Sequence, residues 1–251
     1  MRVRPLAAAA LALALLTGCA QSVDPIERLG RKAAQEVRPH VYAARPVRSY
    51  RRWGLPAPLP RAPRPTPAPA PRPTGTALPP VVTRVPTHDP VVFLTYDDTA
   101  ERDPRFGAMV RELRLPVSVF PADAGNGHPA RPRPARTALR GLPHARRRAG
   151  ICGRRGGLPS RLLRPPHGAY DTDTLRAAAD CGVTALVLWR ATMTAAGRLT
   201  YRHGVHRLCP GDIVSVAPDD GRGPSLTRRT SGLLAKVEER GLTVGRLEDY
   251  L

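Results

Sequence analysis

Two adjacent carboxylates, Asp97 and Asp98, directly follow the apolar, β-rich run 91–96. A pair of carboxylates can act as a general base and as a ligand for a divalent metal ion, which together activate water for hydrolysis. Aspartate is also common where a strand turns into a loop, so the pair alone is equally consistent with a simple turn.

A second motif, Arg-Pro-Pro-His-Gly, occupies residues 164–168. Together with Thr-Tyr-Asp-Asp at residues 95–98, it resembles the polysaccharide deacetylase family, whose NodB-homology domains form carbohydrate esterase family four (CE4). The resemblance covers residues 87–251, and the two motifs together are specific for the family. Similarity to exported members extends to three further runs, 175–189, 211–214 and 243–251.

The resemblance implies a distorted (β/α) barrel that holds a divalent metal ion, usually zinc, and hydrolyses N- or O-acetyl groups on sugars. Such a hydrolase acts on carbon–nitrogen bonds other than peptide bonds, and its implied partner is peptidoglycan or another envelope polysaccharide. By the same resemblance, Asp97 is the general base, Asp98 is the carboxylate ligand of the metal, and Arg164 orients the base. His167 stands where the family has Tyr or Phe, and its backbone N–H would donate to the oxyanion.

Departures from the family pattern bear on the activity. The family takes two metal ligands from a His-Ser/Thr-x-x-His motif, but no pair of histidines has that spacing within residues 122–153. The general-acid histidine belongs after residues 213–214, where Ser-Val-Ala-Pro occupies 215–218, and Thr99 replaces a glycine. A catalytic zinc normally needs three protein ligands, so Asp98 alone does not make a site. We therefore expect the metal site to be lost, and binding of envelope glycan or anionic wall polymer without catalysis is the alternative function.

The sequence leaves two points open: the role of Trp189, and whether other histidines replace the missing metal ligands. Trp189, at the end of an expected strand, either lines a sugar subsite or packs in the core. The stretches 125–163 and 215–229 are rich in Arg, Pro and Gly with little apolar patterning, which is typical of deletion, of a frame shift or of divergence. Replacement metal ligands would have to come from four histidines that otherwise read as ordinary loop residues, namely His128, His144, His203 and His206.

Strands and helices alternate beyond residue 87, which favours parallel strands with crossover helices. We therefore expect an α/β fold of the distorted, incomplete (β/α) barrel type, in which functional groups gather at the carboxyl ends of the strands. Apolar runs predict strands at 91–96, 117–120, 185–189 and 212–216. Caps and amphipathic spacing predict helices at 103–113, 172–181 and 225–240.

The N-terminal region has the features of an exported lipoprotein. Residues 1–18 form a signal peptide, with Arg2 and Arg4 before an apolar run that is too short to span a bilayer. The run ends in Leu-Thr-Gly-Cys, which resembles the lipobox of bacterial lipoproteins, so Cys19 is the expected site of lipid attachment. The alternative is an ordinary secretory signal with a chance cysteine. The lipid would hold the protein at the outer face of the cell membrane, in the cell envelope.

A tether is expected between the anchor and the folded domain at 87–251. Residues 19–54 form a polar, basic arm, and residues 55–86 form a proline-rich linker that favours an extended, disordered chain. The formal net charge of +20 favours anionic partners such as wall polymers or lipid headgroups. Nucleic acid is excluded as a partner, because an exported protein does not meet its usual target and the chain has no recognisable binding module.

Three cysteines remain for an oxidising compartment once Cys19 carries the lipid, so one pair can form a disulfide and one thiol is left over. We expect the pair to be Cys152 and Cys181, because each lies near the end of an expected helix. Cys209 is then the remaining thiol. No two cysteines have the spacing of metal ligands.

Overall fold

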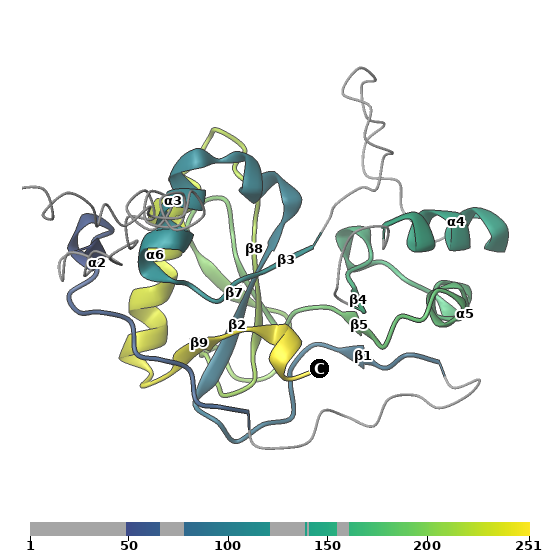
Figure 1. The fold of residues 1–251 in the computed structure, drawn as a ribbon, viewed down its shortest axis with the longest axis horizontal. Helices are drawn as coiled ribbons and strands as arrows, with labels where there is room; N and C mark the ends of the chain where they lie inside the picture. Colours follow the sequence, from purple (N-terminus) through teal and green to yellow (C-terminus); the bar gives the residue numbers. More distant parts are fainter. Residues whose placement is uncertain (1–48, 66–77, 121–138, 140, 155–160) are drawn as a thin grey trace, which may run out of the picture. The chain divides into compact units, whose positions relative to one another are not determined.

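The folded part of the chain contains two β-sheets, and the larger one is built around strand β2 (Figure 1). The computed structural model describes residues 49–65, 78–120, 139, 141–154 and 161–251. Within them, the larger sheet has the strand order β3-β2-β8-β6-β7, and β9 also pairs with β2. Its strands are β2 (Val91–Asp97), β3 (Ser118–Phe120), β6 (Ala191–Met193), β7 (Leu199–Tyr201), β8 (Ile213–Val216) and β9 (Thr243–Gly245).

Strand β2 takes the central place because its side chains are buried along almost its whole length. Residues 91–96 are all buried, and only Asp97 at the carboxyl end is partly exposed. β2 pairs in parallel with β3, β8 and β9, and β6 pairs in parallel with β8, whereas β7 runs antiparallel to β6. Parallel strands that are covered on both faces have continuous apolar sequences, which explains why this strand could be predicted.

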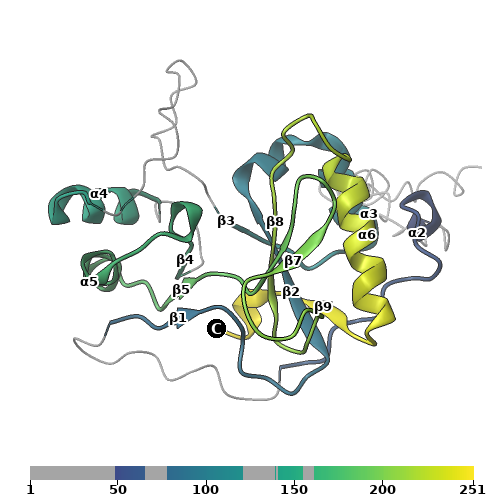
Figure 2. The same ribbon diagram turned by 180° about the vertical axis from the view of Figure 1, so that it is seen from behind.

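Helices α3 (Pro104–Leu113) and α6 (Leu226–Glu239) cover one face of the larger sheet (Figures 1 and 2). Met109 of α3 and Leu233 of α6 pack in one cluster with Leu94 of β2. α3 begins as predicted, because the Asp103 side chain accepts hydrogen bonds from the first N–H groups of the helix. Ser225 caps α6 in the same way.

The smaller sheet has the order β1-β5-β4, with parallel pairing throughout. Its strands are β1 (Val81–Val82), β4 (Leu162–Leu163) and β5 (Ala185–Val187). Helices α4 (His144–Arg154) and α5 (Thr172–Asp180) pack against each other and share an apolar cluster with Leu186 of β5. A disulfide between Cys152 of α4 and Cys181, the C-cap of α5, joins the two helices, and this is the pair that we expected.

Asp171 forms a second link between helices α4 and α5, in addition to the disulfide. Its carboxylate caps α5 by accepting from the N–H of Thr174, and it forms an ion pair with the buried Arg147 of α4. Burial raises the pKa of Asp171, but hydrogen bonds from Thr174 and the charge and hydrogen bond of Arg147 outweigh this effect and bring the pKa to about 2. The carboxylate is therefore ionised over the whole physiological pH range.

Residues 49–65 form a strap that packs on α3 and α6. The strap starts with the short helix α2 (Ser49–Arg52), and Trp53 and Leu55 are buried at 8% and 3% exposure in the same cluster as both helices. The Nε1 of Trp53 donates to Glu112 of α3 at 2.8 Å, and its carbonyl accepts a hydrogen bond of 2.6 Å from Ser231 of α6. The strap therefore bridges the two helices.

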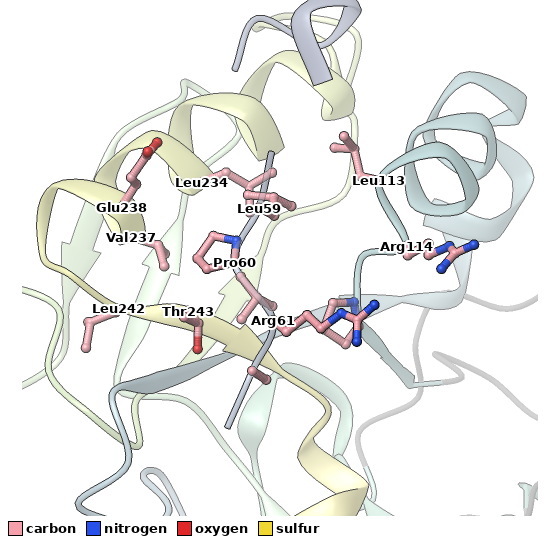
Figure 3. A pocket seen from close by; sticks show the side chains of 13 residues that line it. Leu59, Pro60, Arg61, Leu113, Arg114, Leu234, Val237, Glu238, Leu242 and Thr243 are labelled. Atoms are coloured by element: carbon pink, nitrogen blue, oxygen red, sulfur yellow. The ribbon is translucent and has the colours of Figure 1, made fainter. Parts of the chain in front are cut away.

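The second half of the strap occupies a groove between α3, α6 and β9. Figure 3 shows Leu59 and Pro60 lying close to Leu234 and Val237 of α6, with Leu113 of α3 on the other side. Apolar contact on two sides fixes this proline-rich segment, although it has no regular secondary structure.

The structure describes the expected linker, residues 55–86, only in part, because residues 66–77 lie outside the described residues. Residues 55–65 belong to the strap, and Val81–Val82 form β1, which pairs with β5. At the end of the expected arm, α2 already contacts α3. Proline-rich composition predicts a chain without regular structure, but a few buried apolar side chains are enough to attach it to the domain.

The expected α/β fold with parallel strands is confirmed. The described strands form two separate sheets and no closed barrel, which agrees with the incomplete barrel that we expected. The poor patterning inferred for 125–163 is wrong where it covers α4, whose Ile151 is fully buried. The signal peptide, Cys19 and most of the arm lie outside the described residues. In the part of the chain that is described, no helix is both long and apolar enough to cross a bilayer.

Candidate functional site

A cavity of about 280 Å³ opens at the carboxyl ends of β2, β3 and β8. Asp97, Arg164 and His167, all predicted from sequence, meet in this cavity. Asp97 reaches it from the carboxyl end of β2 in the larger sheet, and Arg164 and His167 reach it from the loop that follows β4 in the smaller sheet. The cavity is lined by Asp97, Phe120, Arg164, Pro165, Pro166, His167, Trp189, Thr192, Ser215, Ala217 and Pro218.

Arg164 is a buried cation that lies beside two aromatic rings. Its side chain is held by a hydrogen bond of 2.6 Å from Nη2 to the hydroxyl of Thr95, and its guanidinium carbon lies 4.4 Å from the ring centroid of Phe120 and 5.2 Å from that of Trp189. Its Nε and Nη1 atoms are buried and make no hydrogen bond within the described residues. Stacking on two aromatic rings partly compensates these unpaired donors.

Asp97 supplies the negative charge that Arg164 faces. Burial lowers the pKa of Arg164 to about 10, and the nearby Asp97 carboxylate opposes this change. Arg164 therefore stays cationic at neutral pH. The expected role of Arg164, to orient Asp97, stays a prediction.

A row of hydroxyl side chains runs across the sheet at the cavity, and two of its members, Thr192 and Ser215, line the cavity; sequence reasoning missed this row. Thr95 of β2 is in register with Ser215 of β8, and Ser215 is in register with Thr192 of β6. Residues paired in parallel strands project to the same face, so the three hydroxyls lie side by side. Only the sheet register reveals the row, because its members lie far apart in the sequence and each is an ordinary strand residue.

The turn around His167 has an unusual backbone. His167 is exposed and adopts a left-handed conformation, with φ 56° and ψ 12°, inside the short 3₁₀ helix Pro166–Gly168. Gly168 also has a positive φ of 68°, and a Cβ atom at this position would lie 3.1 Å from Trp189. Glycine is therefore required where the turn packs on the Trp189 ring.

Trp189 belongs to the cavity wall and is not simply a core residue. Its side chain is half-buried and lines the cavity. Its ring also contacts two cations, because the guanidinium carbons of Arg164 and Arg202 lie 5.2 Å and 5.5 Å from its centroid. Trp189 thus connects the buried charge of the site with an exposed arginine of the loop after β7.

The chain is similar to a known protein in sequence and to solved structures in fold. No protein-family model matches the chain. An uncharacterised protein of Streptomyces coelicolor is 56% identical over 197 residues, which cover 70% of this chain and 79% of the relative. The chain belongs to the family of that protein.

The solved structures identify the fold. A CE4 family pseudoenzyme from Bacillus anthracis has a TM-score of 0.51 and 16% sequence identity, over 68% of this chain and 69% of that protein. The chitin deacetylase of the fungal pathogen Colletotrichum lindemuthianum has 15% identity and a TM-score of 0.49, over 70% of this chain and 92% of the enzyme. The chain has the CE4, NodB-type fold, as the resemblance of its motifs implied.

The metal that CE4 enzymes use does not fit the described residues of this chain. No three His, Cys, Asp or Glu side chains come together there in a way that could hold a metal ion. Asp98 opens a 3₁₀ helix, Asp98–Arg102, but its side chain lies outside what the structure describes. Among the residues that the structure describes, the cavity offers Asp97 and the exposed His167 as ligands for a metal ion. A catalytic zinc normally needs three protein ligands, so these two do not make a metal site.

The histidines considered as replacement ligands have other contacts. His144 forms an ion pair with Asp180, with Nε2 at 3.0 Å from the carboxylate oxygen. His206 stacks on Tyr201, with ring centroids 5.9 Å apart. His128 lies outside the described residues.

A buried ion pair between Arg190 and Asp212 holds the backbone of the loop that carries His203. Asp212 is fully buried and accepts a hydrogen bond of 2.6 Å from Arg190 Nε, and the same guanidinium donates to the backbone carbonyls of His203 and Val205. Asp212 also accepts from the N–H of Cys209, whose thiol is not part of a disulfide. The loop is therefore held by hydrogen bonds to its backbone carbonyls, in addition to the stacking of His206 on Tyr201.

Ala217 and Pro218 line the cavity directly after β8, where the resemblance placed a general-acid histidine. Neither side chain can donate a proton. Buried Arg229 of α6 holds this segment through a hydrogen bond of 2.6 Å to the carbonyl of Ala217. The described cavity thus keeps a carboxylate, an arginine and aromatic walls, but it lacks the acid that a deacetylase would use for the leaving amine.

Proposed function

We propose that this protein binds an envelope polysaccharide in the CE4-type cavity and does not hydrolyse acetyl groups by the family's metal-dependent route. One observation carries the proposal: the cavity keeps Asp97 and Arg164 between the aromatic side chains of Phe120 and Trp189, while Ala217 replaces the expected acid. The shared fold with a protein described as a CE4 family pseudoenzyme supports a role without catalysis.

The chemistry of the cavity suits a sugar. Sugar rings present apolar faces to aromatic side chains and hydroxyl groups to carboxylates and hydroxyls. Phe120 and Trp189 supply the first kind of contact. Asp97, Ser215 and Thr192 supply acceptors and donors for the second. Arg164 adds guanidinium N–H donors beside Asp97 in the same cavity.

The site of action that we propose is the cell envelope. Support comes from the signal peptide at residues 1–18 and from the lipobox-like Leu-Thr-Gly-Cys19, which together indicate export and attachment to the outer face of the membrane. In cells, Cys19→Ser is expected to release the protein from the membrane fraction. Unchanged membrane association of this variant would contradict the lipid anchor.

Binding is tested with insoluble peptidoglycan and chitin as probes. The full chain is expected to co-sediment with at least one of them, and Asp97→Asn and Trp189→Ala are each expected to weaken binding about tenfold, because each removes one main contact. Arg176→Gln is the matched control, since Arg176 is an exposed arginine of α5 that does not line the cavity. Binding through the cavity should survive high salt, whereas nonspecific attraction to a basic protein should not.

Catalysis is tested separately. Acetate release from peptidoglycan and chitin oligomers is measured with added zinc, and zinc content is compared between the natural chain and Asp98→Ala. We expect no acetate release and no zinc above the level of the variant. Zinc near one ion per chain together with acetate release that Asp98→Ala abolishes would refute the non-catalytic proposal and establish a deacetylase.

A further inference from the structure

A second hollow lies where the strap meets the beginnings of α3 and α6, away from the cavity residues described above. Its volume is about 590 Å³. Figures 1 and 2 show α2 beside α3 and α6 in both views. Three elements that are remote in sequence therefore share one concave surface, which we call the arginine hollow. Its polar lining residues are Arg52, Arg105, Ser225, Thr227, Arg228 and Ser231.

Each of the three elements contributes one arginine to the hollow. Arg52 comes from α2, Arg105 from α3 and Arg228 from α6. Arg52 forms an ion pair of 2.8 Å with Glu112, so its charge is partly balanced. Arg105 and Arg228 are exposed, and neither has an acidic partner within the described residues. The hollow therefore carries a net positive charge that the protein itself leaves uncompensated.

Two carboxylates near the hollow in sequence are already engaged. Asp103 accepts hydrogen bonds from the N–H groups of Arg105 and Phe106, and Glu112 accepts from both Arg52 and Trp53. Asp103 therefore balances the start of α3, and Glu112 balances Arg52 of α2. Within the described residues, neither carboxylate forms an ion pair with Arg105 or Arg228.

Hydroxyl groups complete the lining. Ser225 and Thr227 lie 3.2 Å apart through their hydroxyl oxygens, and Ser231 donates to the carbonyl of Trp53. Arginines that line one hollow from three elements, with hydroxyl groups beside them, match a tetrahedral anion with several acceptor oxygens. A single carboxylate would satisfy one guanidinium fork, whereas a phosphate group can accept from two or three.

We propose that the arginine hollow binds a phosphate group. The same chemistry is offered by inorganic phosphate, by the phosphodiester of an anionic envelope polymer and by the headgroup of an anionic lipid. This site is independent of the polysaccharide cavity, so the proposal does not rest on the proposed function. Because the strap supplies one of the three arginines, an occupied hollow also links the strap to both helices through the ligand.

The test uses the purified full chain and inorganic phosphate, with binding followed by calorimetry at constant ionic strength. The site variant Arg105→Gln/Arg228→Gln is compared with the control Arg146→Gln/Arg148→Gln, which removes the same charge from the exposed face of α4. All four arginines are exposed, so both variants should keep the fold, and circular dichroism checks this. We expect saturable phosphate binding that the site variant weakens at least tenfold and that the control leaves within about twofold.

Two outcomes would overturn the proposal. An equal loss of affinity in both variants would show attraction by overall charge, and phosphate binding no greater than that of chloride would show that no site exists. Competition identifies the source of the phosphate. Displacement of bound phosphate by phosphatidylglycerol vesicles, but not by phosphatidylcholine vesicles, assigns a lipid headgroup. Displacement by a soluble poly(glycerol phosphate) assigns an envelope polymer.

Discussion

Truncation of Trp53 tests whether the strap is a structural part of the domain. In Trp53→Ala the strap loses a side chain that is only 8% exposed, together with the hydrogen bond of its Nε1 to Glu112. Truncating a buried aromatic side chain typically costs about 3–5 kcal/mol. Because Trp53 lies at the edge of the cluster, we expect about 3 kcal/mol of lost stability. Trp53→Phe keeps most of the apolar contact but removes the hydrogen bond, so it should cost only about 1 kcal/mol.

The assay is urea unfolding of the full chain at 25 °C, followed by far-ultraviolet circular dichroism. With a slope of about 2 kcal/mol per molar urea, Trp53→Ala should lower the unfolding midpoint by about 1.5 M. Leu78→Ala is the control. Leu78 is an apolar residue with 41% exposure, so its truncation should change stability by less than about 0.5 kcal/mol. A midpoint for Trp53→Ala equal to that of the control would refute the docked strap.

Three further predictions follow from the packing of the domain. Replacing both Cys152 and Cys181 with serine should cost about 3 kcal/mol in the same assay, because the bridge closes a loop of 29 residues; no loss would mean that the bond does not form in solution. Asp171 has a lowered pKa, so its stabilising effect is present above about pH 4 and is lost as the pH falls towards 2; Asp171→Asn should remove this part of the pH dependence of the urea midpoint, and an unchanged profile would contradict it. Arg164→Lys should cost about 1–3 kcal/mol, because lysine cannot stack on two rings while donating to Thr95, and full stability of this variant would argue against the described cation site.

The elements that could be predicted from sequence are those whose local pattern and tertiary environment agree. The run 91–96 is continuously apolar and becomes the central strand, and Asp103 caps the helix that it was expected to cap. Arg164 and Asp97 could be placed in one site because their motifs together resemble a known family, although they follow strands of different sheets.

The remaining features depend on contacts that no local pattern encodes. Trp53 and Leu55 are isolated apolar residues in a polar, proline-rich sequence, so nothing in the sequence predicts the groove that holds them. The hydroxyl row of Thr95, Ser215 and Thr192 depends on the register between strands β2, β8 and β6. For helix α4 only an end near Cys152 was expected and no bounds were predicted, because its apolar face is narrow; its partner α5 and the disulfide supply the rest of its stability.

If Cys19 carries a lipid, as we propose, the docked strap limits how far the cavity can lie from the membrane. A chain extended from Cys19 to residue 87 could span up to roughly 240 Å. With the strap attached from Ser49 onward, the chain between Cys19 and the domain spans at most roughly 100 Å. A lipidated protein with a docked strap would then reach less than half as far from the membrane as one whose strap is released.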